Sequence, residues 1–157
     1  MADLSQLSVR ELLDVWASAL RELRRLGIVR TFNSPIGDIA EELVVLHFGG
    51  QRGAFSQKTW DVAVGEERLQ VKAIRRTGPT LGHLSPVRSD DGYDAVIVVV
   101  FSEDLRVERA IRIPREVVNK LFARNGHVNG RIVRLTRSLL EHPGVETFSL
   151  SEAWLDA

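Results

Sequence analysis

The stretch "WDVAVGEERLQVKAIRR", residues 60–76, carries two strand patterns separated by a turn signal. Side chains alternate between the two faces of a β-strand. In the first pattern the apolar residues share one face, which leaves Asp61 on the other. In the second pattern the apolar residues again share one face, which leaves Gln70 and Lys72 on the other. Each strand is therefore expected to have a polar face that carries ionisable or amide side chains.

A hairpin between these strands would bring the polar side chains together. If both apolar faces are buried on the same side of the sheet, the allowed registers of the two strands differ by steps of two residues. A two-residue loop of Gly65 and Glu66, with Gly first in a type II′ turn, puts Asp61 opposite Gln70. A four-residue loop, 65–68, puts Asp61 opposite Lys72. Both pairings bring the three side chains close, whereas a three-residue loop would separate them.

A carboxylate, an amide and an ammonium group at one place suggest metal-assisted chemistry on phosphate. Carboxylate and amide oxygens are hard ligands that suit Mg²⁺ or Mn²⁺, often with waters completing the shell. A neighbouring Lys can hold a phosphate and orient the attacking water. The same spacing also fits a plain ion pair between Asp61 and Lys72 across a solvated sheet face, and short patterns of this kind match by chance.

Two helices are predicted before this hairpin. Ser8 and Glu11 have capping-box spacing, and a helical apolar stripe follows until Gly27. Trp16, on that stripe, is interpreted as a packing residue. The second helix is predicted with Ser34 as N-cap and Pro35 at its first helical position. That helix is expected to end before Gly49.

The remaining pattern alternates strands and helices. The run "YDAVIVVVF" shows no polar alternation and predicts a central strand buried on both faces, next to the strand that holds Lys72. Residues 76–92 are rich in Gly, Pro and Ser and leave room for a turn of helix at most. The expected elements are strands at about 60–64, 68–75, 93–101, 105–113 and 131–135, a helix from Pro114 to near Asn125-Gly126, and a helix from Thr136 to Pro143-Gly144.

Composition excludes several classes of protein. The chain has 157 residues, 44% hydrophobic and 27% charged, which fits one globular domain. Its 21 basic residues balance 21 acidic ones, so an anionic partner would need a local basic patch. Without Cys, thiolate metal sites are excluded. The N-terminus has no apolar signal-peptide region, and the longest apolar run, Ala95–Phe101, is too short for a membrane span, so we expect a cytoplasmic protein without a membrane partner.

The order of these features resembles the PD-(D/E)xK nuclease superfamily. The residues that carry the resemblance are Asp61, Gln70 and Lys72 on adjacent strands, after a helix that contains "GDIAEELV". The Q-x-K form is similar to that of Mrr-type restriction endonucleases. From "GDIAEELV" to "YDAVIVVVF" the chain also resembles a group of short bacterial proteins assigned to the superfamily. The likeness covers roughly residues 34–118.

The resemblance implies a fold and a set of site residues. The fold would be α/β and restriction-endonuclease-like, with a central mixed, mainly antiparallel sheet flanked by helices. A single nuclease-like domain, 1–157, would consist of an N-terminal helix (1–33), a core that carries the motif (34–118) and a C-terminal extension (119–157). The metal ligands would be Glu41, with Glu42 as the alternative, together with Asp61, Gln70 and the backbone carbonyl of Val71; Lys72 would complete the catalytic set. Asp61, Gln70 and Lys72 would face one side of the sheet, next to the second helix, with Glu41 nearest among the acids of that helix.

The implied activity is hydrolysis of phosphodiester bonds with Mg²⁺ or Mn²⁺, on DNA, in restriction, defence or repair. Gln70 stands where the family has an acid, so the site would carry one negative charge less and bind its cation more weakly. The alternative is an inactive subunit of the same fold that binds DNA or a protein. A homodimer or a protein partner would supply specificity. The basic residues expected to contact nucleic acid are Lys58, Arg75, Arg76 and Arg88.

Overall fold

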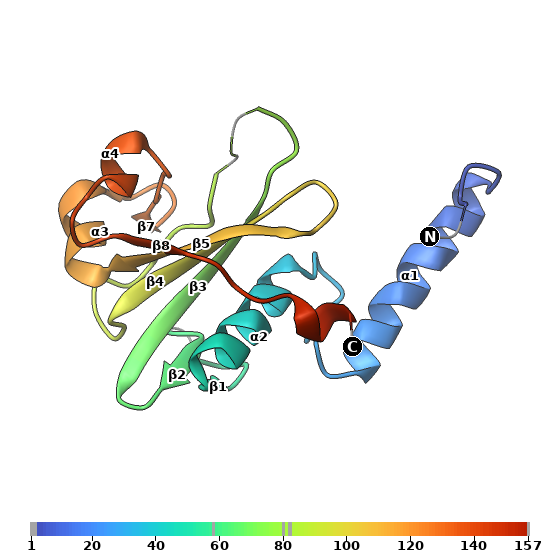
Figure 1. Ribbon diagram of the computed structural model, residues 1–157, viewed down its shortest axis with the longest axis horizontal. Helices are drawn as coiled ribbons and strands as arrows, with labels where there is room; N and C mark the ends of the chain where they lie inside the picture. The colour runs from blue at the N-terminus through green and yellow to red at the C-terminus, as the bar shows by residue number, and fades with distance from the viewer. Residues whose placement is uncertain (1–2, 58, 80, 82, 157) are drawn as a thin grey trace.

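The computed structural model describes residues 3–57, 59–79, 81 and 83–156 and has a mixed α/β architecture (Figure 1). Six strands form one sheet in the order β1-β2-β3-β4-β5-β8, in which only β3 and β4 run parallel among the described strands. The sheet is therefore mainly antiparallel and flanked by helices, as the sequence predicted. The elements are α1 (Val9–Arg25), α2 (Ile36–Phe48), β1 (Gln51–Arg52), β2 (Val62–Val64), β3 (Glu67–Arg75), β4 (Ala95–Phe101), β5 (Val107–Pro114), α3 (Arg115–Leu121), β6 (Arg124–Asn125), β7 (Gly130–Arg131), α4 (Arg137–Leu140), β8 (Glu146–Phe148) and the 3-10 turn η1 (Ala153–Asp156).

The hairpin β2–β3 has the two-residue loop. Val64 is the partner of Glu67, and Gly65 has a φ of 56°, whereas Glu66 is not among the residues with positive φ. A positive φ at the first loop position alone is typical of a type II′ turn. The register then places Asp61, immediately before β2, opposite Gln70. The alternative register, with Asp61 opposite Lys72, is wrong.

Strand β4 is the centre of the sheet. It pairs in parallel with β3 and antiparallel with β5, and all seven of its residues are buried. One face of β4 packs with Val71 against α2, and the other packs in a second cluster with Val117 of α3 and Leu139 of α4. The prediction of a central strand buried on both faces is confirmed. The described residues of the connection from β3 to β4 contain no helix.

Several boundaries differ from the sequence-based expectation. Pro35 is the N-cap of α2 rather than its first helical residue, and Gly49 ends the helix with a φ of 72°. Helix α3 stops at Leu121, well before Asn125-Gly126, because the chain turns into the small β6–β7 hairpin. Strand β7 covers only the start of the expected strand at 131–135. Thr136 caps α4 as expected, through a bond from the Leu139 N–H to its hydroxyl.

Helix α1 differs most from expectation. Ser8 and Glu11 form the predicted capping box, but Leu20 alone among its residues is buried. Figure 1 shows the helix standing away from the sheet, with its C-terminal end closest to the rest of the molecule. Trp16 is 53% exposed, so its interpretation as a packing residue is wrong. Amphipathic spacing predicted that this face is apolar but did not specify what covers it.

None of the described helices combines the length and the apolar character needed to cross a membrane.

Candidate functional site

Asp61 lies where β2 begins, beside the middle of β3. Its Oδ2 accepts a 2.7 Å hydrogen bond from the Val71 N–H, and its own N–H donates to the Leu69 carbonyl at 2.8 Å. Its carbonyl accepts from the Gly53 N–H at 2.7 Å. These bonds fix both the backbone and the side chain of Asp61. No hydrogen bond among the described residues engages its Oδ1, which leaves that oxygen for a ligand.

Gln70 is the one polar residue among the buried side chains of the described chain, at 5% exposed. Its Nε2 donates to the Thr59 carbonyl at 2.8 Å. Because a carbonyl can only accept, this bond fixes which end of the amide is nitrogen and turns Oε1 the other way. Oε1 is buried and has no hydrogen-bond partner among the described residues. Leaving a buried acceptor unsatisfied costs about 1–3 kcal/mol, so this oxygen requires an explanation.

Lys72 shares a hollow with these two residues. The hollow has a volume of about 150 Å³ and is lined by Asp61, Gln70, Lys72, Ser85, Pro86 and Arg88. Burial lowers the pKa of the Lys72 ammonium, and the charge of Arg88 lowers it further, against the opposing charges of Asp61 and Glu41. Lys72 forms no ion pair with any other described residue. The simple Asp61–Lys72 ion pair that the spacing also allowed is therefore absent from the described part of the chain.

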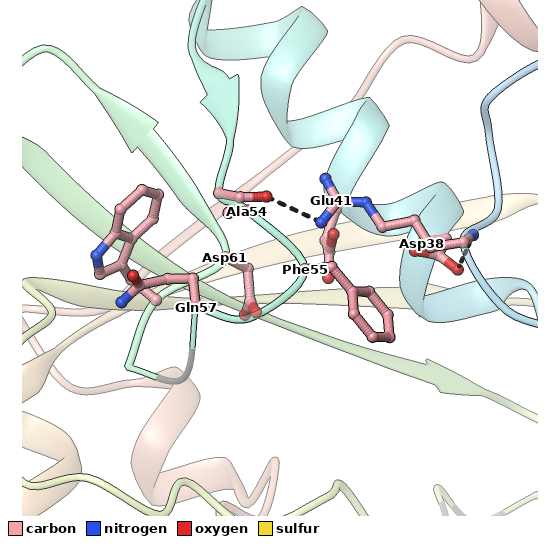
Figure 2. A pocket seen from close by; sticks show the side chains of 9 residues that line it. Asp38, Glu41, Ala54, Phe55, Gln57 and Asp61 are labelled. Atoms are coloured by element: carbon pink, nitrogen blue, oxygen red, sulfur yellow. Dashed lines mark hydrogen bonds between the residues drawn. The ribbon is translucent and has the colours of Figure 1, made fainter.

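Glu41, rather than Glu42, is the acid of α2 that reaches this region. Glu41 and Asp38 extend from α2 into a second hollow, of about 140 Å³, which Asp61 enters from the opposite side (Figure 2). Burial raises the pKa of Glu41, and the nearby charge of Asp61 raises it further. The pKa of Asp61 is also raised, chiefly by burial. Glu42 does not line this hollow.

Asp61, just before β2, lines both hollows. Val71 packs on the α2 face, whereas Ile74 packs with Leu84 and Val87 on the other face. Gln70 and Lys72 have the parity of Ile74 and so face away from α2. The expectation that all three polar side chains lie on the α2 side is wrong for these two. Asp61 precedes β2 and lines both hollows. It therefore lies between Glu41 on the α2 side and Gln70 and Lys72 on the other side.

Arg52 is a site residue that the sequence analysis missed. Its side chain is 9% exposed and forms ion pairs with Asp38 and, at 2.8 Å, with Glu41. A further hydrogen bond joins it to the Ile28 carbonyl at 3.1 Å. Arg52 therefore occupies Oε2 of Glu41 and leaves its Oε1 without a hydrogen bond to the described residues. No spacing signal could have revealed it, since the helix and β1 meet only in the folded chain.

Oxygens of the types that Mg²⁺ and Mn²⁺ prefer line the two hollows on either side of Asp61. One oxygen each of Asp61 and Glu41 and the orphaned Oε1 of Gln70 are hard donors, and one or two carboxylates plus waters is a usual Mg²⁺ set. In a β-strand the N–H and C=O of one residue point to the same side, so the Val71 carbonyl, like its N–H, points toward Asp61. The described residues contain no group of three or more His, Asp or Glu side chains arranged to hold a metal. A cation here would therefore depend on the amide and backbone oxygens as well as on the acids.

The predicted nucleic-acid contacts fall in different places. Arg88 is exposed and lines the hollow that holds Lys72. Arg75 and Arg76 lie at the far end of β3, where Arg75 donates to the Glu103 carbonyl and Arg76 pairs with Glu108. Neither lines the hollow. Lys58 lies outside the described residues.

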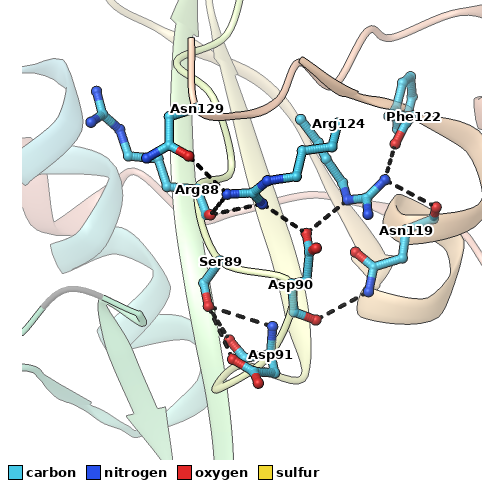
Figure 3. Close-up of polar contacts among 9 residues, drawn as sticks. Arg88, Ser89, Asp90, Asp91, Asn119, Phe122, Arg124 and Asn129 are labelled. Atoms are coloured by element: carbon cyan, nitrogen blue, oxygen red, sulfur yellow. Dashed lines mark hydrogen bonds and ion pairs between the residues drawn. The ribbon is translucent and has the colours of Figure 1, made fainter. Parts of the chain in front are cut away.

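A polar network holds the loop that carries Arg88. The Arg88 carbonyl accepts from both terminal nitrogens of Arg124 at 3.1 Å, and Asp90 accepts from Arg124 at 3.2 Å and from Arg131 at 2.9 Å. Figure 3 shows the Arg88 side chain extending away from this network. The loop is thus tied to the β6–β7 hairpin while the Arg88 guanidinium stays available to an anion.

No protein-family model matches the chain, and no curated protein sequence matches it.

Proposed function

We propose that the chain is a metal-dependent nuclease that hydrolyses phosphodiester bonds, with DNA as the expected substrate. The observation that carries the proposal is the buried Oε1 of Gln70, which has no partner among the described residues; Gln70 lines the same hollow as Asp61 and Lys72. A purely structural hairpin gains nothing from an unsatisfied amide beside a desolvated ammonium group. A site that receives a cation and a phosphate explains both the unsatisfied amide oxygen of Gln70 and the buried ammonium group of Lys72.

The acids and the amide would hold the cation. Asp61 would use Oδ1, because Oδ2 is committed to the Val71 N–H. Glu41 would use Oε1, because Oε2 is bound by Arg52. Gln70 would contribute Oε1. The bound Mg²⁺ or Mn²⁺ would lower the pKa of a water molecule and neutralise charge on the phosphate.

Lys72 and Arg88 would act on the phosphate and the water. Arg88, at the rim of the hollow, would bind a non-bridging phosphate oxygen. The Lys72 Nζ would donate to the phosphate or orient the attacking water. Because its pKa is lowered by burial, a larger fraction of Lys72 is neutral than in water, and neutral Nζ can accept a proton from that water. The raised pKa of Asp61 at the same place is typical of functional sites.

The arrangement of elements supports membership of the PD-(D/E)xK superfamily. Helix α2 with Glu41 precedes the strands that carry Asp61, Gln70 and Lys72, which is the order on which the resemblance depends. The mixed, mainly antiparallel sheet is the architecture that the resemblance implies. Restriction, defence or repair of DNA is then the expected setting, in the cytoplasm.

A second candidate is an inactive subunit of the same fold that binds DNA or a protein. The observation in its favour is Arg52, which forms ion pairs with both Asp38 and Glu41 and thereby gives the α2 acids a structural role. The amide at position 70 also leaves the site with one charge less than the family pattern.

A cleavage assay separates these candidates. Plasmid, linear double-stranded and single-stranded DNA, and RNA are incubated with the full chain in Mg²⁺ or Mn²⁺, and with EDTA. We expect cleavage that requires metal and that falls about 10²- to 10³-fold in Lys72→Ala, the typical effect of losing one group that stabilises the transition state. Lys120→Ala, on the exposed side of α3, is the matched control and should cleave normally. No cleavage of any substrate would favour the inactive subunit, and cleavage that persists in EDTA would contradict the metal-dependent mechanism.

A further inference from the structure

Arg52 contacts only one of the two carboxylate oxygens of Glu41. Its Nε and its Nη2 both donate to Oε2, at 2.9 and 2.8 Å. An arginine that pairs with a carboxylate commonly directs one N–H at each oxygen. Here Oε1 of Glu41 receives no hydrogen bond from the described residues. The guanidinium of Arg52 is therefore held in a position from which it does not close on Glu41.

Asp38 is the second partner of Arg52. It lies three residues before Glu41, so the two side chains leave the same side of α2 (Figure 2). The Nη2 of Arg52, which Glu41 binds, also donates to Oδ1 of Asp38. Oδ2 of Asp38 accepts from the Arg30 N–H at 3.0 Å. Both oxygens of Asp38 are therefore engaged by the protein, whereas Glu41 and Asp61 each have one oxygen that the described residues leave open.

The charges of this cluster do not balance. Two carboxylates face one guanidinium, and no other described residue forms an ion pair with any of the three side chains. Asp38 is 16% exposed, Glu41 19% and Arg52 9%, so water screens their charges poorly. One negative charge therefore remains at the hollow that Asp61 also lines. Without Asp38, Arg52 would cancel the charge of Glu41 and compete with a cation for its carboxylate.

We propose that Asp38 is a positioning residue, which holds Arg52 away from Oε1 of Glu41 and offsets its charge so that Glu41 can bind a cation. This inference rests on the proposed function, whose own evidence is the unsatisfied Oε1 of Gln70. Asp38 sets the affinity of the site for Mg²⁺ or Mn²⁺ without contacting the ion. If the ion pairs of Arg52 only joined β1 to α2, the charge of Asp38 would have no such effect.

The test is a double-mutant cycle in which calorimetry measures the affinity of the full chain for Mn²⁺ alone. Asp38→Asn should bind the ion about tenfold or more weakly, because Arg52 then cancels the charge of Glu41. Arg52→Gln should bind it more tightly, because one positive charge is removed. The variant with both changes again carries one negative charge in the cluster, so its affinity should return to within about threefold of wild type. Arg30, which also lines the hollow, is unchanged in every variant.

Glu42→Gln is the matched control, because it removes the same charge from α2 at a residue that does not line the hollow, and it should leave the affinity unchanged. Urea unfolding shows which variants fold. If those that lack Arg52 do not fold, Asp38→Asn is compared with Glu42→Gln, and equal affinities overturn the inference. A folded double variant that binds no better than Asp38→Asn also overturns it and leaves the metal centre standing. A wild-type chain that does not bind Mn²⁺ overturns the metal centre and this inference together.

Discussion

The carboxylate of Asp61 accepts a hydrogen bond from the backbone N–H of Val71, at 2.7 Å. Val71 lies beyond the start of β2, so its N–H donates to the Asp61 side chain instead of to a backbone carbonyl of β2. The bond holds one oxygen of Asp61 against the strand that carries Gln70 and Lys72. The register of the hairpin therefore determines the position of Asp61 relative to Gln70 and Lys72. A change in the loop at Gly65 would alter that position.

Removing Arg52 should destabilise the protein strongly. Arg52→Ala leaves the half-buried carboxylates of Asp38 and Glu41 without their counter-charge, and breaking such a buried pair typically costs about 3–5 kcal/mol. Urea unfolding measures the change in the free energy of unfolding. The exposed Arg21→Ala serves as control and should change it by less than about 0.5 kcal/mol. A loss below about 1 kcal/mol for Arg52→Ala would show that the α2 acids do not need this partner.

Replacing Lys72 with Met should stabilise the fold while abolishing cleavage. Burial lowers the pKa of Lys72, so the native state holds its ammonium group at an energetic cost that Met removes. We expect the free energy of unfolding at neutral pH to rise by about 0.5–2 kcal/mol, as is common when a functional group is replaced by a stabilising one. Thermal unfolding and the cleavage assay together check this. A Met variant that is less stable would mean that Lys72 is a structural residue.

The raised pKa values of Asp61 and Glu41 predict a pH dependence of stability. A carboxyl group with a raised folded-state pKa binds more protons in the native state than in the unfolded state, so its stabilising contribution is present at low pH and lost as pH rises through the raised pKa. Asp61→Asn should therefore gain stability relative to wild type as pH rises from about 4 to 8 in EDTA. Urea unfolding of both proteins across this range gives the difference. A difference that is constant with pH would contradict the shift.

Local patterns predicted much of the fold for identifiable reasons. The alternation around Val62 and Val71 determined which faces of β2 and β3 are buried. It left loops of two and four residues open, and the pairing of Val64 with Glu67 shows that the two-residue loop is correct. The uninterrupted run in β4 required burial on both faces. The exposure of Trp16 was not predictable, because an amphipathic pattern identifies an apolar face without identifying its partner.

The site was predictable only in part. Asp61, Gln70 and Lys72 are close in sequence, so strand geometry was enough to bring them together. Glu41 could not be separated from Glu42 by periodicity, since both lie near the boundary of the buried face of α2; the position of Asp61 distinguishes them. Arg88 was among the expected phosphate contacts and does line the hollow that holds Lys72. Arg52 was not predictable, because it reaches the site through contacts with α2 that leave no trace in local spacing.

Titration with Mn²⁺ tests most directly whether Asp61 and Gln70 form a metal centre. Isothermal calorimetry on wild type, Gln70→Glu and Asp61→Asn measures the affinity of each chain for the ion alone. We predict binding by wild type, tighter binding by Gln70→Glu because a carboxylate restores the missing charge, and loss of binding by Asp61→Asn. If no chain binds Mn²⁺, or if Asp61→Asn binds as tightly as wild type, the site is not a metal centre.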